Sequence, residues 1–76
     1  MINLDLVYLI NNLVKEFEKE KDIKFIEENK RIITFKNNKE VFIISENGVI
    51  KSINGCQRKL FFDLFDVVSK TRAENI

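Results

Sequence analysis

Cys56 is the residue with the greatest potential for covalent chemistry, and it is the only cysteine of the chain. A helix start beside Arg58 and Lys59 would favour the reactive thiolate. The sequence has no histidine, however, and so lacks the commonest general base and the commonest metal ligand. One cysteine also cannot build a zinc site or an intramolecular disulfide. We therefore interpret Cys56 as a small residue next to a helix cap.

Paired carboxylates are the next candidates, because two acids on one helical face can hold a divalent ion or perform acid–base catalysis. The pairs are Glu16 with Glu20 and Asp63 with Asp66. Lys59 and Lys70 lie four residues from the second pair, which identifies it as a solvated charged stripe. With two glycines, the chain also lacks the usual phosphate-binding loops. The sequence predicts a non-enzymatic protein without cofactor, metal ion or small-molecule substrate.

Composition narrows the class of protein further. The 76 residues are 45% hydrophobic and 33% charged, which predicts one folded domain covering residues 1–76. A net charge of +1 is too balanced for a dedicated duplex-DNA binder. Short apolar runs exclude a membrane span, while the single cysteine and the absence of a basic leader favour the cytoplasm. Asn, Ile and Lys supply 30 residues, a bias typical of AT-rich genomes and their phages or plasmids.

Hydrophobic periodicity predicts two amphipathic helices that enclose four short strands. Apolar residues recur with helical spacing over residues 2 to about 20, and again in a second helix that starts at residues 54–57 and runs to about 72. Asn54 and Gln57 have the spacing of a capping box for the second helix. Strands are predicted at 23–28, 31–36, 40–45 and 49–53. The expected fold is α+β with order αββββα, in which both helices cover one face of a three- to four-stranded antiparallel sheet.

The strand register follows from the turns. Asn47-Gly48 predicts a type I′ hairpin that pairs Ser45 with Ile50. With a two-residue turn at Asn37-Asn38, one face carries Ile32, Thr34, Val41, Ile43, Ile50 and Ser52, and the other Ile33, Phe35, Phe42, Ile44, Val49 and Ile53. A three-residue turn at Asn37 would exchange the faces of the second strand. In either case both faces are apolar, which predicts that something covers the second one.

This apolar excess provides the main functional hypothesis. Leu4 and Tyr8 project from the polar side of the first helix and Phe62 from the second. Together with the sheet residues Ile32, Val41, Ile43 and Ile50, they form the predicted protein interface, since exposed apolar patches and aromatic anchors mark interaction sites. The partner is a second copy or a host protein, and the expected role is a regulator or inhibitor from a phage or mobile element. The alternative is that a small domain leaves some apolar surface exposed without function.

The second hypothesis is a nucleic-acid-binding module that uses Lys30, Arg31, Arg58 and Lys59. The helix-strands-helix order and the basic pair Arg58-Lys59 at the start of the last helix resemble the double-stranded-RNA-binding domain, a family that reads A-form RNA partly through that helix start. The sequence departs from the family at Leu60-Phe61-Phe62, where small residues would follow the basic cluster, and it has an additional strand. A competing interpretation is that these cations keep turns and strand edges soluble.

Overall fold

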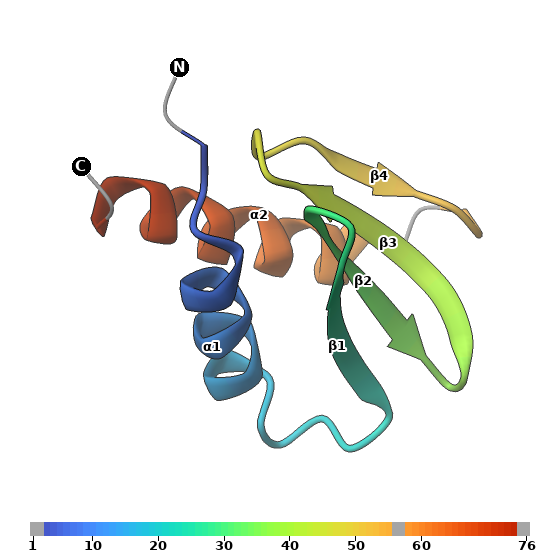
Figure 1. The fold of residues 1–76 in the computed structure, drawn as a ribbon. Helices are drawn as coiled ribbons and strands as arrows, with labels where there is room; N and C mark the ends of the chain where they lie inside the picture. Colours follow the sequence, from blue (N-terminus) through green and yellow to red (C-terminus); the bar gives the residue numbers. More distant parts are fainter. Residues whose placement is uncertain (1–2, 56–57, 75–76) are drawn as a thin grey trace.

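The computed structural model describes residues 3–55 and 58–74, which form a helix, a four-stranded antiparallel sheet and a second helix. The elements are α1 (Leu6–Glu16), β1 (Ile23–Glu28), β2 (Arg31–Lys36), β3 (Lys39–Ser45), β4 (Ile50–Ser52) and α2 (Arg58–Glu74). The strands are ordered β1-β2-β3-β4, and both helices lie on the same face of the sheet (Figure 1). The predicted αββββα architecture is confirmed.

Helix α1 begins after Asp5, later than the periodicity predicted. The Asp5 carboxylate accepts hydrogen bonds from the amides of Val7 and Tyr8 at 3.0 and 3.2 Å, which makes it the N-cap. Leu4 therefore precedes the helix, and helical spacing does not apply to it. It occupies the N′ position of a hydrophobic staple with Leu9, and both side chains belong to the core. The prediction that Leu4 is exposed was wrong, since it is 6% exposed.

Helix α2 packs beside α1 and buries one of its faces in the core. Its buried residues are Leu60, Leu64, Val67, Val68 and Thr71. The Arg72 guanidinium donates to the carbonyl of Asn47 at 2.7 Å and thereby ties the end of α2 to the β3–β4 loop. Asn54, predicted as the cap of this helix, donates to the carbonyl of Glu40 at 2.6 Å. Gln57, the other half of the predicted capping box, lies outside the described residues.

The first two hairpins turn at the predicted residues, whereas the third differs from the prediction. Asn29-Lys30 and Asn37-Asn38 both have positive φ at two successive positions, which is the signature of type I′ turns. At Asn47-Gly48 the loop has three residues. The Gly48 amide donates to the Ser45 carbonyl, the Ser45 amide donates to the Val49 carbonyl, and Gly48 has φ +86°. This is a type I turn followed by a left-handed glycine, so Ile44 pairs with Ile50 and the predicted Ser45–Ile50 pairing was wrong.

A β-bulge in β3 changes the register between β2 and β3. Phe35 pairs with Glu40 but Thr34 pairs with Phe42, so Val41 is the extra residue. The hydroxyl of Thr34 accepts a hydrogen bond from the Phe42 amide at 3.1 Å and donates to the Phe42 carbonyl at 3.4 Å. Thr34 is 1% exposed, so these bonds satisfy polar groups that water cannot reach.

The bulge and the three-residue loop overturn the predicted division of the faces, because a slip of one residue moves a side chain to the other face. Ile32, Val41 and Ile50 pack with the helices in the core, together with Phe42 and Ile44. Ile43 pairs with Ile33, and neither belongs to that core cluster. Of the four sheet residues predicted to share an open face, only Ile43 lies on the face that the helices leave uncovered.

We expect Thr34→Val to lower the free energy of unfolding by about 1–3 kcal/mol, because valine keeps the volume of threonine but leaves the buried Phe42 amide without a partner. Thr71→Val is the matched control. Thr71 is equally buried, but its hydroxyl bonds only the Asn12 side chain, at 2.9 Å, and that amide can also reach Glu74. Urea unfolding of both variants measures the difference. An equal loss in the two variants would contradict a special role for Thr34.

Candidate functional site

The sheet face turned away from the helices carries a central apolar cluster, here called the outer face. It consists of Ile26, Ile33, Phe35 and Ile43. Cross-strand pairing joins Ile26 of β1 to Ile33 of β2, and Ile33 to Ile43 of β3. Ile33, at the centre, is 5% exposed, whereas Ile26, on the edge strand, is 47% exposed. Helices cover the opposite face (Figure 1), so this cluster is shielded only by its own neighbours.

Charged side chains border the cluster at both ends of the strands. In one row across the sheet, Glu28 pairs with Arg31, and Arg31 pairs with Ser45. In the opposite row, Lys24 pairs with Phe35, and Phe35 pairs with Glu40. Lys51 of β4 ends the middle row beside Ile43. An apolar centre with a polar rim is the usual anatomy of a protein interface.

Sequence reasoning identified Ile43 but missed Ile26, Ile33 and Phe35 as members of one surface. A bulge has no reliable sequence signal, and Val41 is an ordinary strand residue. The signal that the sequence did offer is the two-residue turn at Asn29-Lys30, which fixes the register between β1 and β2. From β1, the pairing alone places Ile26 opposite Ile33.

A second apolar surface lies on α2, in the other layer of the molecule. The rings of Phe62 and Phe65 pack on Phe61 with centroid distances of 5.8 and 6.5 Å, and Phe61 packs on Phe42 of the core at 6.2 Å. Phe62 is 59% exposed, in agreement with the prediction that it projects from the domain. Its predicted role as an interface residue remains a prediction.

Tyr8, another predicted interface residue, contacts the second helix of its own chain. Its hydroxyl donates to a carboxylate oxygen of Glu74 at 3.2 Å, and the amide of Asn12 donates to Thr71 at 2.9 Å beside it. Tyr8 is 37% exposed, so it lies at the rim of the α1–α2 contact. Its position on the polar side of α1 therefore has an explanation within the chain.

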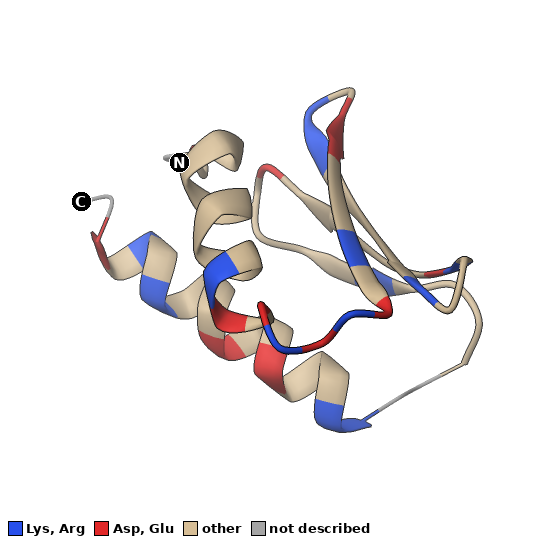
Figure 2. Cartoon of the chain, turned by 90° about the horizontal axis from the view of Figure 1, so that it is seen from below, with Lys and Arg blue, Asp and Glu red and all other residues tan. Residues whose placement is uncertain are grey.

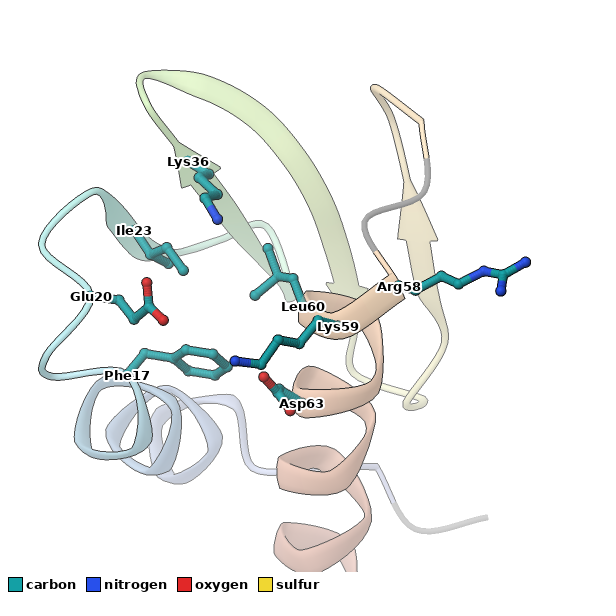
Figure 3. Close-up of a pocket in the computed structure, with 8 residues that line it drawn as sticks. All are labelled: Phe17, Glu20, Ile23, Lys36, Arg58, Lys59, Leu60 and Asp63. Carbon is teal, nitrogen blue, oxygen red and sulfur yellow. The ribbon is translucent and has the colours of Figure 1, made fainter.

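An open pocket of about 280 Å³ lies where α1, β1 and the start of α2 converge. Figure 3 shows the side chains of Lys36 and Lys59 directed into it together with Glu20 and Asp63, whereas Arg58 points away. Phe17, Ile23 and Leu60 form its apolar wall. Two carboxylates offset two ammonium groups, so the pocket has no strong preference for an anion or a cation.

The four predicted nucleic-acid-binding residues do not come together. Lys30 and Arg31 lie at the β1–β2 turn, while Arg58 and Lys59 line the pocket that contains Lys36, at the far end of β2. Five residue steps of a strand separate the two ends by about 17 Å. Acidic residues are interspersed, with Asp63 and Asp66 following the basic start of α2 (Figure 2). These four cations therefore form two separate pairs, and the nucleic-acid hypothesis remains a prediction.

The remaining chemistry of the described residues is limited. Over residues 3–55 and 58–74, no three acidic or sulfur-bearing side chains gather closely enough to hold a metal ion. Within the same ranges, neither helix has the length and apolarity needed to cross a membrane. Cys56, the one candidate nucleophile, lies outside the described residues.

Comparison of the sequence with family models and curated proteins, and of the fold with solved structures, finds no match.

Tyr8 is the only tyrosine, so its titration can be followed directly by near-ultraviolet absorbance. The hydrogen bond to Glu74 and the negative charge of that carboxylate raise the pKa of Tyr8 above its ordinary value, because the phenolate would lose the bond and be repelled. The hydrogen bond therefore stabilises the folded chain at pH values below the ordinary pKa of tyrosine. This stabilisation is lost as the pH rises through the raised pKa. Glu74→Gln should shift the titration to lower pH, and Glu18→Gln should leave it unchanged. An unshifted Glu74→Gln curve would show that the contact is absent in solution.

Proposed function

We propose that this chain is a small protein-binding module that acts by occupying a partner's surface, and that the outer face is its binding surface. The observation that carries the proposal is the placement of both helices on one side of the sheet, which leaves Ile26, Ile33, Phe35 and Ile43 together on the other. Water-exposed antiparallel faces normally alternate with polar residues. Ile33 is 5% exposed within the chain, but the same row ends at Ile26, which is 47% exposed, and an occupant of this face would cover it.

Binding without catalysis also agrees with the side-chain inventory. The chain has no imidazole, and the pocket beside α2 contains two opposed pairs of charges. A regulator or inhibitor needs shape and apolar anchors but no reactive group. We propose this role, in a phage or another mobile element as the composition suggests, and in the cytoplasm as the single cysteine suggests.

The outer face is preferred over the aromatic cluster of α2 as the primary surface. Phe62 and Phe65 are 59% and 51% exposed, but both rings already pack on Phe61, which in turn packs on Phe42. The outer face extends over three strands and has a charged border on both sides. It therefore offers a broader and more specific contact surface.

The proposal is tested with a photo-crosslinking phenylalanine derivative placed at position 43 and, in a separate protein, at position 62. We expect the probe at position 43 to form one defined covalent adduct with the binding partner. An excess of the unlabelled chain should prevent this adduct by competing for the partner. Adding Ile26→Asp should weaken this binding at least about tenfold, since burying an isoleucine contributes roughly 1.5–3 kcal/mol and an aspartate at the contact adds a desolvation cost.

Val7→Asp is the matched control, because Val7 is 61% exposed on α1, in the other layer. It should leave the crosslink unchanged. Adducts that form only at position 62, or that persist in Ile26→Asp but disappear in Val7→Asp, would assign binding to the helical side and refute the proposal.

A further inference from the structure

The charges that border the outer face are arranged in a self-complementary way. Three rows cross the strands: Glu28, Arg31 and Ser45; then Ile26, Ile33, Ile43 and Lys51; then Lys24, Phe35 and Glu40. The first row is acidic on β1 and basic on β2. The third row is basic on β1 and acidic on β3. From β1 toward β3, the first row therefore runs from negative to positive charge, and the third row runs from positive to negative.

We propose that the occupant of the outer face is a second copy of this chain, related by a two-fold axis that runs along the isoleucine row. This inference rests on the proposed role of the outer face as a binding surface. A rotation of 180° about that axis lays each isoleucine over its own counterpart. It lays the first row of one copy over the third row of the other, so Glu28 meets Lys24 twice, as isologous contacts require.

The same rotation brings Arg31 of one copy over Phe35 of the other, with Glu40 of that copy on the neighbouring strand. Arg31 has a buried Nε without a hydrogen-bond partner among the described residues. A guanidinium favours both an aromatic face and a carboxylate as neighbours. The contact would therefore place an aromatic ring and a carboxylate beside this guanidinium.

A two-fold axis along the strands gives a poorer match. That rotation exchanges the two edges of the sheet and places Lys51 over Ile26, and Phe35 over Glu40. It pairs no opposite charges across the contact, and it places the Glu40 carboxylate over the ring of Phe35, whose face carries partial negative charge. In the favoured arrangement Lys51 faces Lys51, but at the β4 edge, where both ammonium groups can extend into solvent.

Sheet packing geometry is compatible with the proposed contact. Stacked sheets cross at about 30°, which displaces corner residues about 10 Å from the axis by only about 5 Å. The long side chains of Lys24 and Glu28 can span that displacement. The patch measures roughly 20 by 17 Å, smaller than a standard interface of about 800 Å² per partner. We therefore expect a dimer that dissociates on dilution.

Charge exchange tests the arrangement by sedimentation of the intact chain over a range of concentrations. Glu28→Lys and Lys24→Glu alone should each weaken dimerisation at least tenfold, because each places like charges together at both symmetric contacts. An equimolar mixture of the two variants should restore dimerisation, since one chain then carries two lysines and the other two glutamates at these positions. The double variant should dimerise like the original chain.

Glu27→Lys is the matched control, since it makes the same charge change on the same strand but on the face turned toward the helices. It should leave dimerisation unchanged. Melting curves of all variants check that each remains folded, because Glu28→Lys also places a lysine beside Arg31 within the chain. Ile43→Ser distinguishes a dimer that packs through the outer faces from a dimer that pairs along the exposed β1 edge. The variant should weaken the face-packed dimer and leave the edge-paired dimer unchanged.

Each unfavourable result has a distinct meaning. A mixture that fails to restore dimerisation, or a dimer insensitive to the single variants and to Ile43→Ser, overturns the two-fold arrangement. A chain that is monomeric at its highest soluble concentration overturns the choice of a second copy. If position 43 then still crosslinks to a different protein, the outer face remains a binding surface and only the identity of the occupant was wrong.

Discussion

The bulge at Val41 is the constraint on which the rest of the sheet depends. One extra residue in β3 brings Thr34 opposite Phe42, and the threonine hydroxyl satisfies both backbone groups of that buried residue. From Phe42 to Ser45, each side chain of β3 lies on the opposite face of the sheet from the one it would occupy in a regular hairpin. Phe42 and Ile44 join the helices in the core, and Ile43 joins the outer face. The bulge, whose buried backbone groups Thr34 satisfies, therefore decides which apolar residues of β3 join the core and which lie on the outer face.

The division of apolar residues between the two faces reflects the small size of the domain. Two helices of 11 and 17 residues cover one side of a four-stranded sheet, and residues 3–55 and 58–74 form no further element on the other side. A small domain hides a modest fraction of its surface. Selection for solubility alone would place threonine, lysine or glutamate at position 26, where the isoleucine is 47% exposed. Isoleucine at this position is a cost to solubility that an assembly would offset.

The sequence was informative where local rules dominate. Helical spacing, strand alternation and the asparagine turns predicted the order of elements, and the bounds of β1 and β2, because each depends on neighbouring residues. It failed where one residue alters a long-range register. Gly48 fits a type I′ turn and a type I turn with a left-handed glycine equally well, and Val41 carries no mark of its extra position. Leu4 was misplaced for a related reason, since the cap at Asp5 decides whether helical geometry applies to it. The candidate site inherited these errors, because its membership depends on register.

The position of the charges argues against regarding the outer face as leftover surface. Lysines that only protect an edge strand need no counterpart elsewhere. Here Lys24 and Glu28 lie four residues apart on β1, on the same side of the strand and on either side of Ile26. In a single chain they are too distant to interact strongly with each other, and only Glu28 has an oppositely charged residue, Arg31, directly across the strands. A second copy laid over the isoleucine row gives both charges an oppositely charged partner at once. An unrelated protein would need its own pair of charges at matching positions. In the proposed dimer, one two-fold rotation would thus cover the apolar row and pair the charges at its two ends.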